Sequence, residues 1–245
     1  LAPAASDGDA WINCSPNGEG LLLETDRFDS QCSSWPCLAL VNKDVSKAIT
    51  PKMGTQTIHV QAFSAISSNA DVLVFPETTD GHAMDLFVSR KTGSGDDSWS
   101  TPVNLTAATP NAHNSWPAIS EDGTKVLYTC SPVAFTNEGA SLCEVGIDGT
   151  GYRMVYAPSD HPDYSSGNLH SPDYLPGRGI VFEGDWGGEQ IWLLPEGAGA
   201  APAAAGAGHT NDNSPCGLPD GSLASLWLNR PGGTGIHELK LTRAD

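Results

Sequence analysis

The chain is poor in basic residues and lacks any long apolar run. Only 12 of its 245 residues are Lys or Arg, against 29 Asp and Glu, which gives a formal net charge of −17. Binding of nucleic acid needs a basic patch, so this composition excludes that class of partner. No apolar run reaches the ~18 residues that a membrane-spanning helix requires, and we expect no transmembrane segment. The acidic surface suits cations, basic partners or simple solubility.

The sequence also lacks the short motifs of the common enzyme classes. It contains no Gly-x-Ser-x-Gly nucleophile elbow, no phosphate-binding Gly-x-x-x-x-Gly-Lys-Ser/Thr loop, no His-Glu-x-x-His and no EF-hand loop. The Cys-x-x-Cys spacing of zinc sites is absent as well. We therefore predict no catalytic residue, and a binding role is favoured over an enzymatic one.

A turn signal recurs along the chain at a nearly constant spacing. Asp-Gly between strand-like runs predicts a hairpin, because Gly adopts the positive φ that a tight turn needs. The copies end at residues 18, 70, 123, 177 and 221, at steps of 52, 53, 54 and 44. They are Ser15-Pro16-Asn17-Gly18, Ser67-Ser68-Asn69-Ala70, Glu121-Asp122-Gly123, Leu175-Pro176-Gly177 and Pro219-Asp220-Gly221.

Each turn is followed by an apolar strand-like run, a polar loop and a second such run, which predicts one small antiparallel sheet repeated five times. A single small sheet cannot bury both faces, so neighbouring sheets must stack. Units of about this size are typical of propeller blades. A large β-sandwich is the alternative, and the regular step favours the propeller.

Two stretches resemble the WD40-like (PD40) repeat of TolB-type β-propellers. One is Trp99-Ser-x-Pro-x-Asn104-Leu105 followed by Pro117-Ala-Ile-Ser-Glu-Asp-Gly-x-x-Val-Leu-Tyr128, and the other is Asp80-Gly-His-Ala-Met-Asp-Leu-Phe-Val-Ser-Arg90. The match is good over residues 64–129 and patchy elsewhere. The resemblance implies an all-β propeller fold and a protein-binding role, without a shared active site.

We predict a single domain over residues 1–245, a five-bladed β-propeller whose closed ring is stapled by disulfides. The blades are expected at about 9–58, 59–112, 113–169, 170–212 and 213–245. The last blade ends soon after its third strand, so either N-terminal residues complete it or it stays three-stranded.

Six cysteines can be paired from their positions in the repeat. Cys130 and Cys143 fall on adjacent strands of blade 3, and Cys32 and Cys37 share one loop. Cys14 and Cys216 fall on the innermost strands of the first and last blades, where a Cys14–Cys216 bridge would close the ring. Free buried thiols are the alternative. Disulfides imply an oxidising compartment, so we expect an extracellular or periplasmic protein.

Four histidines precede or begin the innermost strands: His59, His113, His170 and His209. Such side chains would meet at the mouth of a propeller channel, where they could ligate a divalent metal ion. Structural or solvated histidines are the alternative, and no cofactor is certain.

The tryptophans divide into two groups. Trp99, Trp116, Trp192 and Trp227 fall at repeat positions, where burial between blades is expected. Trp11, Trp35 and Trp186 lie in or near loops and are predicted to stack on a ligand.

We therefore expect a TolB-like binding module that grips a protein segment or a glycan through its channel mouth or one face. A metal-dependent polysaccharide-degrading enzyme with channel-side histidines is one alternative. A structural surface or scaffold protein is the other.

Overall fold

The computed structural model shows an all-β chain. It describes residues 9–14, 20–25, 37–42, 48–49, 52–53, 56–57, 63–79, 83–93, 98–186, 190–197, 199–205, 212–227 and 238–242. No helix among these residues has the length and apolar character needed to cross a membrane.

Within the described residues the strands form five successive antiparallel meanders, named here the first to the fifth. The first contains β1 (Asp9–Cys14), β2 (Gly20–Thr25), β3 (Cys37–Asn42) and β4 (Ala48–Ile49), and the second contains β7 (Ala65–Ile66), β8 (Val72–Thr79), β9 (Ala83–Arg90) and β10 (Val103–Asn104). The third contains β11 (His113–Ile119), β12 (Lys125–Ser131), β13 (Ser141–Gly146) and β14 (Arg153–Tyr156). The fourth contains β15 (Leu169–Leu175), β16 (Gly179–Gly184), β17 (Gln190–Pro195) and β18 (Ala203–Ala204), and the fifth contains β19 (Asp212–Gly217), β20 (Leu223–Trp227) and β21 (Glu238–Thr242).

Two smaller features complete the description. A short hairpin of β5 (Lys52–Met53) and β6 (Gln56–Thr57) follows the first meander. The second and third meanders share one sheet, because β9 and β11 are joined by a single parallel pairing of Met84 with His113.

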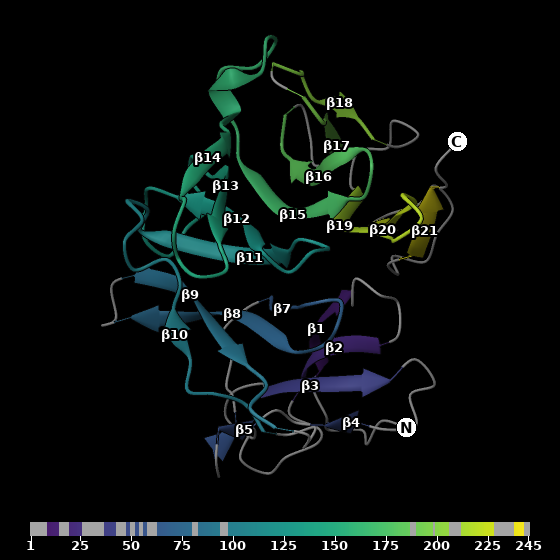
Figure 1. Cartoon of the computed structure of the whole chain (residues 1–245). Coiled ribbons are helices and arrows are strands. Elements are labelled where there is room, and N and C mark those ends of the chain that lie inside the picture. The colour runs from purple at the N-terminus through teal and green to yellow at the C-terminus, as the bar shows by residue number, and fades with distance from the viewer. Residues whose placement is uncertain are drawn as a thin grey trace.

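The meanders lie around a common centre, with the first strand of each nearest the middle (Figure 1). The inner strands β7 and β11, β11 and β15, and β15 and β19 contact one another. The last strand of each meander lies outermost (Figure 1). Among the described residues, the inner strands therefore bring parts of the chain that are far apart in the sequence together at the centre.

The predicted turns between the first two strands of a meander are confirmed where the structure describes them. Their final residues have positive φ: 57° at Ala70, 70° at Gly123, 70° at Gly177 and 76° at Gly221. The predicted turn at Gly18 lies outside the described residues. Ala70 adopts the left-handed conformation that Gly occupies in the other three turns, so the turn position is kept although the residue differs.

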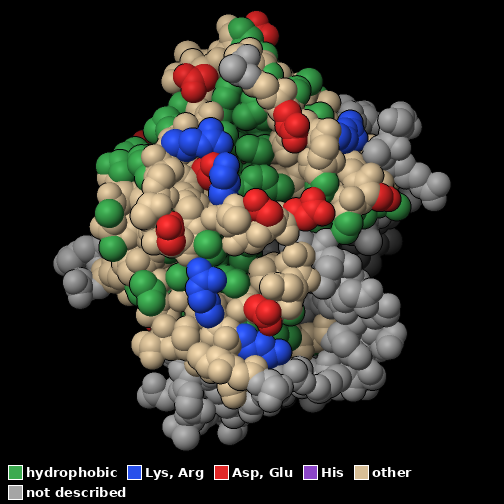
Figure 2. Space-filling view, in the orientation of Figure 1, with side chains coloured by type: hydrophobic (Ala, Val, Ile, Leu, Met, Phe, Trp, Pro, Cys, Tyr) green, Lys and Arg blue, Asp and Glu red, His purple; other side chains and the backbone are tan. Residues whose placement is uncertain are grey.

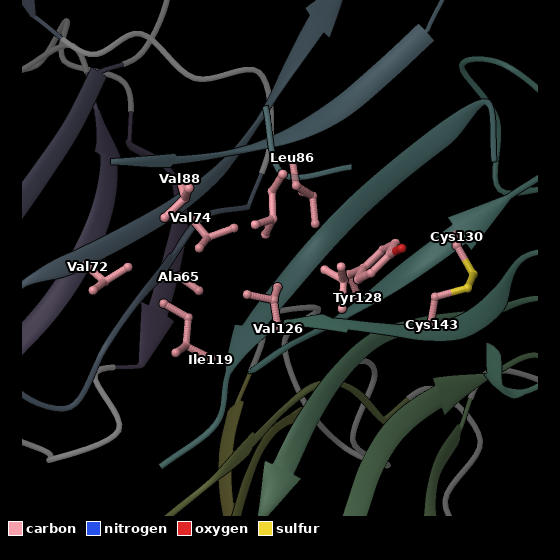
Figure 3. Packing of buried hydrophobic residues seen from close by; sticks show 12 residues of the cluster. Ala65, Val72, Val74, Leu86, Val88, Ile119, Val126, Tyr128, Cys130 and Cys143 are labelled. Carbon is pink, nitrogen blue, oxygen red and sulfur yellow. A yellow bond between two sulfur atoms is a disulfide. The ribbon is translucent and has the colours of Figure 1, made fainter. Parts of the chain in front are cut away.

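Each pair of successive meanders shares a hydrophobic core. Side chains of a strand alternate between its two faces, so Leu73 and Phe75 of β8 pack with Leu22 and Leu38 of the first meander. Val72 and Val74 face the other way, toward the third meander. Figure 3 shows this second cluster, in which Val74 and Leu86 of the second meander lie against Ile119 and Val126 of the third.

Similar clusters join the third meander to the fourth and the fourth to the fifth. The first contains Leu142, Leu169, Phe182 and Trp192, and the second contains Leu175, Val181, Ile191 and Leu223. The middle strands are therefore buried on both faces, which explains why their sequences read as continuous apolar runs.

One predicted disulfide is directly observed. Cys130 of β12 and Cys143 of β13 are bonded, with their Cα atoms 5.9 Å apart (Figure 3). Cys37 and Cys216 each take part in a further disulfide. The predicted pairings Cys32–Cys37 and Cys14–Cys216 remain predictions, because Cys32 and the side chain of Cys14 lie outside what the structure describes.

Candidate binding site in the central cavity

Three inner strands carry the same irregularity beside the centre of the molecule. In β11, β15 and β19 the pairing register shifts by an extra residue at an X-Pro dipeptide, and the residue before the proline has positive φ. The dipeptides are Trp116-Pro117, Ser171-Pro172 and Ser214-Pro215, with φ of 46°, 46° and 51° at the first residue. Proline cannot donate to the ladder, so it favours a bulge at this position. Bulges of this kind redirect side chains and are common beside functional sites.

The bulges border a cavity of about 120 Å³ between β7, β11, β15 and β19. Its lining combines aromatic, hydroxyl and carboxyl side chains, among them Phe63, Trp116, Ser171, Asp173 and Ser214. This volume is below the ~300–1,000 Å³ typical of pockets for whole small molecules. The cavity therefore suits a group of side-chain size.

Aromatic rings form one side of this region. The ring centroids of Phe63 and Trp116 are 5.2 Å apart, and those of Trp116 and His170 are 5.8 Å apart. The indole Nε1 of Trp116 is buried and has no hydrogen-bond acceptor among the described residues. The sequence predicts burial of Trp116 between blades; the structure shows a half-buried residue whose ring lies at the cavity, where the bulge places it.

Asp173 supplies a carboxylate to the same cavity. Its Oδ2 accepts the backbone N–H of Gly217 at 2.7 Å, and its Oδ1 accepts the N–H of Tyr174 at 2.8 Å. Burial raises the pKa of Asp173 to about 7, although these two hydrogen bonds oppose the shift. The ionisation of this carboxyl group therefore changes near neutral pH.

A second carboxylate, outside the cavity, anchors the neighbouring residue Tyr174. The Tyr174 hydroxyl donates to Oε2 of Glu144 at 3.1 Å. Burial opposes ionisation of Glu144, but Arg153 at 2.9 Å and Lys125 at 3.2 Å hold its pKa below the ordinary value. This network fixes β15 against the third meander and so positions Asp173.

The three tryptophans predicted to bind ligand have different outcomes. Trp186 is only 1% exposed, and its ring stacks on Tyr164 and contacts His161. The prediction for Trp186 is therefore wrong, because the loop that carries His161 and Tyr164 folds over the ring. Trp35 lies outside the described residues, and for Trp11 the structure describes only the strand β1, so both remain predictions.

The four predicted metal ligands are not shown together. His113 is buried where β11 meets β9 and β12, and burial lowers its pKa. His170 contacts the Trp116 ring nearer the centre. His59 and His209 lie outside the described residues. Among the described residues no three His, Cys, Asp or Glu side chains form a metal-binding group.

Sequence reasoning missed the X-Pro bulges and Asp173. The signal for the bulges was present, because each of three inner strands carries a proline shortly before its turn glycine. Pro117 and Pro215 precede that glycine by six residues, and Pro172 precedes it by five. A proline inside a strand pattern indicates a bulge. No local signal marked Asp173, since its importance comes from burial against β19.

No protein-family model and no curated protein match the sequence. The structure resembles TolB from Agrobacterium tumefaciens with a TM-score of 0.63 and 18% identity, over 90% of this chain and 70% of that one. TolB from Acinetobacter baumannii gives a TM-score of 0.59 and 16% identity, over 94% of this chain and 52% of that one. The fold is a β-propeller.

A third structure that matches is Kuenenia stuttgartiensis hydrazine synthase, with a TM-score of 0.62 and 14% identity, over 95% of this chain and 37% of that one. The chain thus spans about 70% of the first TolB structure and about half of the second. The expected resemblance to TolB-like propellers is confirmed at the level of the fold.

Proposed function

We propose that this propeller is a binding module that grips a segment of another protein at the mouth of its central cavity. The observation that carries the proposal is the cavity itself, where strained residues on three inner strands present aromatic and polar side chains to one space. Residues in such backbone conformations persist where the surrounding structure holds them, often at ligand sites. The TolB-like fold supports a protein partner over a catalytic role.

We further propose that residues 1–245 form one domain, a closed ring of five blades. The five meanders and the cores that they share in sequence order support five blades. β1 and β19 are the innermost strands of the first and fifth meanders (Figure 1), and Cys216 is disulfide-bonded. A Cys14–Cys216 bridge would latch the ring.

Disulfide mapping tests this closure. Non-reducing digestion and mass spectrometry should recover one peptide pair joining Cys14 to Cys216 and another joining Cys32 to Cys37. The observed Cys130–Cys143 bridge serves as the internal control. A bridge from Cys14 to any residue except Cys216 would contradict the closed ring.

The disulfides also support a location outside the reducing cytoplasm. Bridges of this kind form and persist in the periplasm or outside the cell. We propose a secreted or periplasmic protein.

Selection from a displayed peptide library tests the binding function. We expect the purified protein to enrich peptides that bind with micromolar affinity, and Trp116→Ala to weaken that binding about tenfold or more, because a central aromatic anchor is lost. Phe135→Ala is the control, since Phe135 is an exposed aromatic residue that does not line the cavity. Melting curves establish that both variants fold.

Three outcomes would contradict the proposal. One is a protein that enriches no peptide, and another is binding that Trp116→Ala leaves unchanged. The third is binding on a glycan array without any peptide binding, which would make the ligand a carbohydrate.

A further inference from the structure

The cavity carries charge of one sign. Among the described residues that line it, Asp173 and Glu121 are acidic and no residue is Lys, Arg or His. The whole chain has a net charge of −17, and on the face in Figure 2 the Lys and Arg side chains are interspersed with Asp and Glu. A cationic group is therefore favoured at the mouth and inside the cavity.

The cavity also offers an apolar wall next to this charge. Phe63 and Trp116 contribute ring surface, and Ala65, Pro117 and Pro172 add further apolar surface. A long cationic side chain needs both features, because its methylene stem packs on apolar surface while the charged end reaches a carboxylate. Aromatic faces attract the cation further.

We propose that the cavity receives a lysine side chain from the bound protein segment, with its ammonium group on Asp173 and its methylene stem along Trp116 and Phe63. This inference rests on the proposed function and specifies what the site recognises. Both Asp173 oxygens already accept a backbone N–H. The lone pairs that remain suit a compact ammonium better than the two-pronged fork of a guanidinium.

The size of the cavity agrees with a single side chain. Its volume of about 120 Å³ is smaller than a pocket for a whole ligand. The partner's backbone would then stay at the mouth, where Glu121 is exposed at the rim. Ser171 and Ser214 supply hydroxyl groups along the path.

The pH dependence of binding follows from the same carboxyl group. The pKa of Asp173 is raised to about 7 by burial, so the carboxylate forms as the pH rises through neutrality. The titratable groups nearest to it are Glu121 after β11, His170 at the aromatic side, and Tyr174, whose hydroxyl is bonded to Glu144. His113, also on β11, is buried at the pairing of that strand with β9 and β12. β7 and β19 contribute no charged side chain to the lining among the described residues. Lysine itself stays protonated below its ordinary pKa of ~10.4.

The test uses blocked pentapeptides that differ only in the central residue. Acetyl-Gly-Gly-Lys-Gly-Gly-amide is titrated into the protein by calorimetry or NMR, beside the norleucine and arginine versions. We expect the lysine peptide to bind at least tenfold more tightly than the norleucine peptide, and about tenfold more tightly at pH 8 than at pH 6, from the change in ionised fraction. Acetylation removes the N-terminal amine as an alternative source of the ammonium group.

Asp173→Asn is the decisive variant. The asparagine keeps an oxygen for the Gly217 N–H but removes the charge, so lysine binding should weaken about tenfold or more and lose its pH dependence. Glu196→Gln is the matched control, because it removes one exposed negative charge away from the cavity. Butylammonium, a mimic of the side chain alone, should compete with the lysine peptide in the wild-type protein.

Different outcomes separate this inference from the function on which it rests. If library-selected peptides bind through Trp116 but show no need for lysine, the lysine assignment is wrong while the binding function stands. If butylammonium binds at Asp173 but no peptide is enriched, the cavity is cation-selective and the protein-binding function is wrong. Equal binding of the norleucine peptide, tighter binding of the arginine peptide, or an unaffected Asp173→Asn variant would each overturn the inference.

Discussion

Gly217→Ala is expected to lower the free energy of unfolding by about 3 kcal/mol, in the range of strongly overpacked sites. A Cβ atom at position 217 would overlap the backbone carbonyl oxygen of Tyr174. That oxygen belongs to β15 and cannot move aside like the end of a flexible side chain. β19 would have to separate from β15, and the 2.7 Å hydrogen bond from the Gly217 N–H to Asp173 would lengthen. The substitution thus acts where the fourth and fifth meanders meet.

Urea denaturation followed by tryptophan fluorescence measures this effect. Gly93→Ala is the matched control, since a Cβ at Gly93 would meet no atom within 4 Å and its φ is not positive. We expect that control to change stability by less than about 0.5 kcal/mol. If Gly217→Ala and Gly93→Ala unfolded at the same urea concentration, the backbone of β19 could not lie in close contact with the Tyr174 carbonyl of β15.

Asp85→Ala is expected to lower the free energy of unfolding by about 3–4 kcal/mol, because four donors lose their acceptor together. The Asp85 carboxylate accepts hydrogen bonds from Asn104 Nδ2 at 2.8 Å and Thr106 Oγ1 at 3.1 Å. It also accepts from Asn114 Nδ2 at 3.2 Å and Thr79 Oγ1 at 3.3 Å. Asn114 is fully buried on β11, so the network ties the second meander to the third.

The comparison with Asp85→Asn separates the contributions of shape and charge. Asparagine retains one acceptor oxygen, so this variant should lose about half as much stability as Asp85→Ala. Asp163→Ala, which changes an exposed loop carboxylate, should stay within about 0.5 kcal/mol of the wild type. If Asp85→Ala were as stable as Asp163→Ala, the hydrogen-bond network could not be what joins the two meanders.

The Asp85 network also explains part of the sequence resemblance. Asp85 lies in one of the two stretches that resemble the PD40 repeat, and Asn104 lies in the other. The structure joins them by the hydrogen bond from Asn104 to Asp85, and Thr106 adds a bond to the backbone N–H of Leu86 at 3.0 Å. The sequence therefore indicated the two stretches, whereas only the structure showed that hydrogen bonds between them are the physical reason for the pattern.

The candidate site was much less predictable than the fold. Trp116 and Ser214 lie about a hundred residues apart in the sequence, and nothing local to either indicates that both line one cavity. The failed prediction for Trp186 has a similar cause. Its exposure depends on a loop some twenty residues earlier, and His161 and Tyr164 of that loop cover the ring.

The sequence by itself determined the features that depend on short-range chemistry. These are the left-handed turn positions such as Gly123 and Gly221, the apolar strands that follow them, and the Cys130–Cys143 bridge across one hairpin. Tertiary structure decided which side chains meet at the centre, and how strongly burial perturbs Asp173. The physical reason is that turn and strand preferences act over a few residues, whereas a cavity depends on how separate sheets pack around it.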